Sequence, residues 1–133
     1  GLPVRHIEEQ HNVPMYVTNI DTRPSGIFRG PLTVSMRPMT MKEAIKATEI
    51  TTHYKQVHGT PIHIGRPEDI GIKDLSQPDF GESVQINEGE VPVFWGCGVT
   101  PQSVALAAKP DLVITHAPGH MFVTDVLESQ MGD

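Results

Sequence analysis

Glycine and proline interrupt this chain too often for long regular elements to form. Its 133 residues include 12 Gly and 12 Pro. Proline breaks helices and central strands, and glycine in either element costs conformational entropy. The sequence therefore excludes long helical bundles and coiled coils, and it predicts many loops and turns. A chain of this length suits one domain with a single hydrophobic core.

The charge balance of the chain is acidic. Lys and Arg number 10 against 16 Asp and Glu, which gives a formal net charge of −6. With no basic cluster and only 5% aromatic residues, the chain lacks the features that bind nucleic acid. No apolar run approaches the roughly 20 residues of a membrane span. We therefore expect a soluble, globular protein whose partners are neither nucleic acids nor membranes.

The cysteine content and the first residues bear on the compartment. Cys97 is the single cysteine and cannot form an internal disulfide, so a reducing interior is expected. This would be the cytoplasm, or the mitochondrial matrix in a eukaryote. The chain begins at Gly1 without an initiator Met or a signal-peptide pattern, which favours a processed product or a piece of a longer chain.

Two half-buried strands are predicted in the first part of the chain. Residues 13–17 and 32–36 alternate apolar and polar side chains, and turn residues at 23–26 lie between them. Pro14 has no N–H to donate to a neighbouring strand. The first strand is therefore expected at an edge of the sheet.

A helix over about residues 41–56 is predicted next. Thr40 and Glu43 have the spacing of a capping box, in which each side chain satisfies the other residue's backbone N–H. One helical face carries Met41, Ala44, Ile45, Thr48 and Thr52. Beyond this helix we predict a short strand at 62–64 and a loop-rich stretch over 65–81 with at most one turn of helix.

The most regular pattern lies between residues 91 and 115. An apolar strand at 91–95 leads to Thr100, which is expected to cap a helix over 101–108 that begins with proline. A second apolar strand is predicted at 112–115. A strand–helix–strand unit of this length allows a right-handed crossover between parallel strands.

The predicted fold class is therefore α/β with a mixed sheet. The strand–helix–strand unit lies in a sub-region over 87–133, and a smaller α+β sub-region over 1–86 precedes it. The strand at 91–95 is apolar throughout, as in sheets that are covered on both faces. Because the chain offers only one long helix and one short one, we expect the second face to need a partner region or a second copy.

Histidines are the main candidates for chemistry, because their ordinary pKa lies near neutral pH. His116 and His120 follow the predicted strand at its carboxyl end, where open α/β sheets place their ligand crevices. His58 and His63 flank a proline-containing turn, and His63 is expected to point away from the core. For His63, a solvated strand residue and a catalytic residue are equally consistent with the spacing.

The segment Gly96-Cys97-Gly98 before Thr100 is a candidate anion-binding site, since backbone N–H groups at a helix start attract carboxylates. Cys97 could be a nucleophile, but a small buried thiol is the better interpretation. Arg37 could bind a substrate carboxylate with two hydrogen bonds and is favoured over Arg29 for this role.

A metal site is the weaker alternative. His116, His120 and Asp125 contain the ligand types that bind zinc. Their spacing on a Pro-Gly loop lacks the fixed geometry that two histidines have on a helix, and no metal or other cofactor is predicted.

Several motifs in order along nearly the whole chain resemble a known family. The chain is similar to the putative hydro-lyase family that includes D-glutamate cyclase-like proteins. The motifs are NVPMY (12–16), GP (30–31), VSMRP (34–38), HGTPIHIG (58–65), PDFG (78–81), VPVFWGCGVTP (91–101) and THAPGHM (115–121).

The resemblance implies an α/β lyase of amino-acid metabolism that cyclises D-glutamate to 5-oxo-D-proline with loss of water. Members of the family carry a further segment, about as long as this chain, before the position that matches Gly1. The resemblance therefore implies that residues 1–133 are the C-terminal half of the family's domain. Its expected partners are a small carboxylate or amino-acid substrate and either the missing half or a second copy.

Such a reaction needs proton transfer, a held carboxylate and support for the oxygen of the attacked carboxyl group. We assign acid/base roles to His116 and His120 with His58 or His63, and Asp125 is expected to orient one imidazole. Substrate binding is assigned to Arg37, Gly96, Cys97, Gly98 and Thr100. His63 is expected within about 10 Å of His116. Two alternatives stay open, a metal-assisted hydrolase or lyase and a non-catalytic binding or assembly half.

Overall fold

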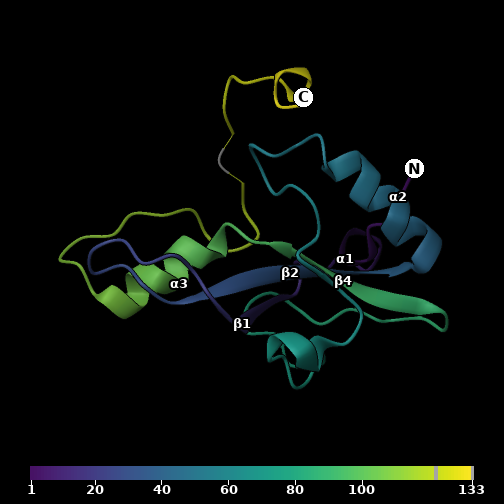
Figure 1. Ribbon diagram of the computed structural model, residues 1–133, viewed down its shortest axis with the longest axis horizontal. Coiled ribbons are helices and arrows are strands. Elements are labelled where there is room, and N and C mark those ends of the chain that lie inside the picture. Colours follow the sequence, from purple (N-terminus) through teal and green to yellow (C-terminus); the bar gives the residue numbers. More distant parts are fainter. Residues whose placement is uncertain (122, 133) are drawn as a thin grey trace.

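The computed structural model describes residues 1–121 and 123–132 and contains one four-stranded sheet in the order β1-β2-β4-β3 (Figure 1). The strands are β1 (Met15–Asp21), β2 (Pro31–Thr40), β3 (His63–Ile64) and β4 (Glu90–Gly96). The helices are α1 (Arg5–Glu8), α2 (Met41–Thr51) and α3 (Val99–Ala108), and the short 3-10 turns are η1 (Pro67–Ile70) and η2 (Glu128–Gln130). The mixed α/β class is confirmed. None of the described helices is long and apolar enough to cross a membrane.

Strand β2 lies in the middle of the sheet and pairs with β1 on one side and β4 on the other. Both pairings are antiparallel, as is that of β3 with β4. The predicted edge position of β1 is confirmed. Because β2 belongs to 1–86 and β4 to 87–133, the two sub-regions share this one sheet.

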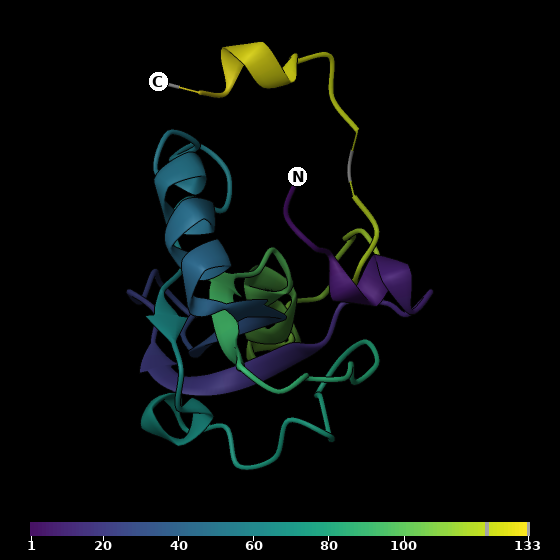
Figure 2. The same ribbon diagram turned by 90° about the vertical axis from the view of Figure 1, so that its right-hand side faces the viewer.

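The two faces of the sheet carry separate hydrophobic clusters, because side chains alternate along each strand. Phe94 of β4 and Met36 of β2 are directly paired and lie on the face covered by η1, which we call the turn face. Val93 and Trp95 lie on the opposite face with α2, which we call the helix face. Figure 2 shows α2 and η1 on opposite sides of the sheet.

The centre of β4 does not need the outside cover that was expected for the strand at 91–95, whereas Val91 and Pro92 are half-buried. Val93, Phe94 and Trp95 are all buried by this chain alone. Ala44 and Ala47 of α2 pack on the helix face, and loop residues cover the turn face in place of a helix. These loop residues are Ile70, Ile72, Leu75, Val84 and Ile86.

Helix α2 begins as predicted and ends earlier. The Thr40–Glu43 capping box is present, but the helix ends at Thr51 rather than near 56. Threonine hydroxyls in its last turns bond backbone carbonyls four residues back, which weakens helix continuation. The predicted apolar face is also shifted, since Met41 and Ile45 are exposed whereas Ala44 is buried.

Helix α3 begins at Val99 with Gly98 as its N-cap residue, so the predicted cap at Thr100 is wrong. The Thr100 hydroxyl instead accepts from Thr33 N–H and donates to Thr33 O, both at 3.0 Å. This pair of hydrogen bonds attaches α3 to β2. Ser103 also contacts the Thr33 hydroxyl, which places α3 on the helix face.

The predicted strand at 112–115 does not form, and with it the parallel crossover is wrong. Leu112 and Ile114 are 78% and 87% exposed. A strand exists only where a neighbouring strand pairs with its N–H and C=O groups, and no described strand runs beside this segment. The apolar pattern alone therefore did not determine its structure.

Phe94 is the residue whose loss should most weaken the fold. It is fully buried and packs edge-on against Tyr16 with ring centroids 6.5 Å apart. We expect Phe94→Ala to lower the free energy of unfolding by about 3–5 kcal/mol in urea titrations. The matched control is Phe28→Ala, because Phe28 is 43% exposed, and its loss should be below about 1 kcal/mol. Equal losses in the two variants would contradict the core described here.

Candidate functional site

A cavity of about 430 Å³ opens on the helix face. Its walls come from the N-terminal segment, β2, α2 with the loop after it, β4 and the C-terminal segment. They are mainly apolar, and Arg37, His58 and Glu128 are the residues among them that carry charged or imidazole groups. The full lining is Leu2, Pro3, Val4, Arg37, Met39, Ala47, Ile50, Thr51, Tyr54, Val57, His58, Gly59, Trp95, Glu128 and Met131.

Arg37 is the cation of this cavity. Its guanidinium carbon lies 5.4 Å from the centre of the Trp95 ring, in a cation–π contact, and Nη1 donates a long 3.4 Å hydrogen bond to Ser35 Oγ. Burial lowers the pKa of the guanidinium, and the nearby Cys97 acts in the opposite direction. Within residues 1–121 and 123–132, no carboxylate lies in ion-pair distance of Arg37. The cavity therefore holds a partly buried positive charge that has no counter-ion among the described residues.

Two further polar atoms near Arg37 are buried without a hydrogen-bond partner in the described part of the chain. They are Nε1 of Trp95 and Nδ1 of His6. Burial lowers the pKa of His6, and the positive charge of Arg37 lowers it further. His6 therefore resists protonation in this place, and a neutral ring can present Nδ1 as either donor or acceptor.

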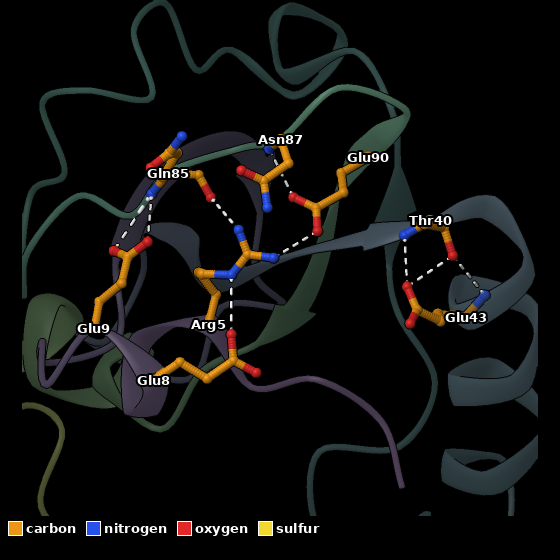
Figure 3. Close-up of polar contacts among 8 residues, drawn as sticks. All are labelled: Arg5, Glu8, Glu9, Thr40, Glu43, Gln85, Asn87 and Glu90. Atoms are coloured by element: carbon orange, nitrogen blue, oxygen red, sulfur yellow. Dashed lines mark hydrogen bonds and ion pairs between the residues drawn. The ribbon is translucent and has the colours of Figure 1, made fainter.

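The position of His6 depends on its neighbour Arg5, which fastens α1 to the start of β4 (Figure 3). Arg5 Nη2 donates to Glu90 Oε1 at 2.6 Å, Nη1 to Gln85 O at 3.1 Å and Nε to Glu8 Oε2 at 3.1 Å. The Glu90 side chain is only 8% exposed, so this ion pair is shielded from solvent. It holds the N-terminal segment against the sheet.

His58 lies at the cavity with its ring fixed by β4. Its Nδ1 is 2.6 Å from Gly96 O, and since a carbonyl oxygen only accepts, Nδ1 carries the proton. In this tautomer, Nε2 is the ring nitrogen that can act as an acceptor. His58 lines the same cavity as Arg37, which makes it the imidazole best placed for acid/base chemistry there.

His116 reaches the same segment of the chain as His58. Its Nε2 lies 3.7 Å from the position that a Cβ on Gly98 would occupy. The ring donates through Nδ1 to Ala117 O at 2.8 Å, and Gln102 of α3 donates to the His116 carbonyl at 2.6 Å. The structure therefore brings His58 and His116 to the 96–98 segment.

His120 and Asp125 are less closely tied to this group. His120 Nδ1 donates to Pro118 O at 3.2 Å, and the same carbonyl accepts from Asn12 Nδ2. Asp125 is exposed, and no hydrogen bond or ion pair links it to an imidazole of the described residues. No three His, Cys, Asp or Glu residues in those parts of the chain are grouped closely enough to share a metal ion, and this includes His116, His120 and Asp125.

His63 lies on the turn face, across the sheet from Arg37. It pairs with Phe94, and its ring packs on the Phe94 ring with centroids 5.9 Å apart. The expectation that it points away from the core is therefore wrong, because the turn face carries a core of its own. Its Nε2 donates to Arg66 O at 2.7 Å. The structure does not bring His63 to the cavity.

The segment Gly96-Cys97-Gly98 offers fewer free backbone donors than its composition suggests. The Cys97 N–H donates to Thr33 O at 2.9 Å, which extends the pairing of β4 with β2. The Thr100 hydroxyl is also engaged with β2. Gly98 precedes the first turn of α3, where backbone N–H groups have no partner within the helix.

Sequence reasoning missed Trp95 as part of this site and His6 as a neighbour of Arg37 outside the cavity lining. His6 had no pattern around it, since its position depends on contacts of Arg5 with residues far along the chain. A signal for Trp95 was present. In the predicted strand at 91–95 it alternates with Phe94, so it had to lie on the face opposite Phe94.

An apolar cavity with a few polar groups, here a guanidinium without a carboxylate partner among the described residues and an imidazole, is typical of small-molecule binding sites. The chain belongs to the D-glutamate cyclase family, which it matches over residues 1–125.

Relatives of the chain come from several bacteria. A protein of Staphylococcus saprophyticus named "Putative hydro-lyase" is 75% identical over 133 residues, which is all of this chain and 51% of the relative. Similarly named proteins of Staphylococcus carnosus and Stutzerimonas stutzeri are 73% and 58% identical, over 100% and 99% of this chain and 51% and 50% of their own length. The chain thus spans about half the length of these relatives. The mitochondrial expectation finds no support among them.

The lowered pKa of His6 predicts how the free energy of unfolding depends on pH. The unfolded chain binds a proton on His6 more readily than the folded chain does. The stability that comes from a neutral His6 is therefore fully present above the ordinary histidine pKa of about 6.5 and is lost as the pH falls below that value. We expect His6→Gln to reduce the decline in unfolding free energy between about pH 6.5 and pH 5, measured by urea titration at several pH values. The control is His53→Gln, at an exposed position. An unchanged decline in His6→Gln would contradict the environment described for His6.

Proposed function

We propose that this chain provides the carboxylate-binding and proton-transfer groups of a lyase that interconverts D-glutamate with 5-oxo-D-proline and water. The observation that carries the proposal is the unpaired guanidinium of Arg37 in a cavity that His58 also lines. The family and the hydro-lyase names of the relatives support the reaction class. The bacterial cytoplasm is the proposed location.

The chemistry assigns one task to each group. The substrate ammonium group loses one proton before its nitrogen attacks the carbon of the distal carboxyl group and a second proton after the attack, and one oxygen of that group takes up two protons and leaves as water. A base near the amine and an acid near the leaving oxygen are required. Nε2 of His58 can accept the first proton, because the Gly96 carbonyl keeps the proton of the neutral ring on Nδ1.

Arg37 would hold the other carboxylate, so that the reacting end of the substrate lies toward His58. A guanidinium can bind both oxygens of one carboxylate, which fixes orientation as well as position. His116, next to Gly98, is the proposed acid for the leaving oxygen, with His120 in the same loop as its partner in proton transfer. The free end of α3 at Gly98 favours negative charge on that oxygen.

The proposal is tested by removing the titrating groups one at a time. In the intact protein, we expect His58→Asn and His116→Asn each to lower kcat for the conversion of D-glutamate by roughly 10²–10⁴-fold. Melting temperatures should hardly change, because both side chains are exposed. His53→Asn, at an exposed position outside the cavity lining, is the matched control and should keep full turnover. Unchanged turnover in both His58→Asn and His116→Asn would remove them from the mechanism.

A further inference from the structure

We propose that the cavity on the helix face binds a single carboxylate carried on an uncharged, largely apolar body, and that His6 and Trp95 join Arg37 around the carboxylate. This inference rests on the proposed function only for its physiological ligands. It concerns which chemical form the cavity holds more tightly, whatever reaction follows.

Hydrogen-bond donors at the cavity lack acceptors among the described residues. Arg37 has five N–H donors, and the one hydrogen bond described for its side chain is the long contact to Ser35. The indole N–H of Trp95 can only donate, and Trp95 is 4% exposed with Nε1 unpartnered in the described residues. Buried donors are normally paired, so an acceptor is missing from this arrangement. A carboxylate accepts several hydrogen bonds at once and fits this need.

His6 and Arg37 are a pair of neighbouring basic groups. His6 does not line the cavity, but it lies close enough to Arg37 for that charge to disfavour its protonation. Its Nδ1 atom is buried without a partner among the described residues. An anion beside both groups would reverse this effect, since it favours the charged form of the imidazole. His6 would then donate a charge-assisted hydrogen bond to the same ligand.

The lining of the cavity limits the charge that a ligand can carry. Among the described residues that line the cavity, Arg37 is the only Lys or Arg and Glu128 the only acidic residue. Tyr54 and His58 are the other titratable residues in this described part of the lining, and Cys97 and His6 lie close to Arg37. A second carboxylate would meet apolar walls or Glu128, so it would lose hydration without gaining a cation. The cavity should therefore prefer a monoanion to a dianion.

This preference separates the two sides of the proposed reaction. 5-Oxo-D-proline has one carboxylate and a neutral ring, whereas D-glutamate adds a second carboxylate and an ammonium group. The apolar walls match the ring form, and a cavity of about 430 Å³ is within the range for small ligands. We expect the ring form to bind more tightly.

The binding test adds three probes to this 133-residue chain. Calorimetry measures their affinities, and NMR measures the pKa of the His6 ring. Cyclopentanecarboxylate should bind, its neutral carboxamide should bind at least about 10-fold more weakly, and glutarate should also bind more weakly. Carboxylate binding should raise the pKa of His6. Equal affinity for the acid and the amide, or tighter binding of glutarate, would overturn the proposal.

Single substitutions then identify the groups that hold the carboxylate. Arg37→Met should weaken cyclopentanecarboxylate binding by about 10–100-fold without lowering the melting temperature, because an unpaired charge is replaced by an apolar side chain. Trp95→Phe keeps an aromatic ring, removes the N–H and should weaken binding by about 10-fold. His6→Gln should weaken it by a similar factor. Folded variants that bind like the unsubstituted chain would overturn the assignment of these groups.

Glu128→Gln is the matched control, since Glu128 lines the cavity without an ion pair to Arg37. Its affinity for cyclopentanecarboxylate should change by less than about threefold. A large gain in affinity would mean that the Glu128 carboxylate occupies the site in solution, and would overturn the proposal.

Failure of the proposal and failure of the proposed function give different results. Selective binding of 5-oxo-D-proline without turnover by the intact protein would overturn the reaction and leave the carboxylate site standing. Turnover with an unchanged KM in folded Arg37→Met and Trp95→Phe variants would overturn the carboxylate site and leave the reaction standing.

Discussion

The antiparallel pairing of β2 with β4 is the interaction on which the rest of the structure depends. Its register places Arg37 opposite Val93 and Met36 opposite Phe94, so the two pairs face opposite sides of the sheet. A slip of one residue in either strand would move the side chains of that strand to the other face. A slip of β2 would place the Arg37 guanidinium in the core of the turn face, and a slip of β4 would place Phe94 on the side of the cavity. One register therefore determines both the core and the candidate site.

Arg37 contributes little to holding the fold together. A charge withdrawn from water without a counter-ion disfavours the folded chain, and the Trp95 ring offsets only part of this effect. The hydrophobic clusters on both faces of the sheet supply the stability that tolerates it. An arginine in such a position is typical of functional sites, where stability is exchanged for the ability to bind.

Local features of the sequence predicted local structure well. The Thr40–Glu43 capping box needs only residues three apart, and it is present as expected. The segment 112–115 has the composition of a strand, but a strand also requires a partner that composition does not specify. The same limit applies to the site. Arg37 could be nominated from its residue type, whereas the place of His6 follows from the bond of Arg5 to Glu90, 85 residues away.

The origin of the cavity walls has a consequence for folding. Residues from Leu2 to Met131 line it, drawn from both ends of the chain and from the sheet between them. No short segment could form this site by itself, so any molecule that fills it binds the folded chain and not the unfolded one. At a concentration 100 times its Kd, such a molecule would add about 2.7 kcal/mol to the free energy of unfolding. Substrate supply would then also control how much of the protein survives in the cell.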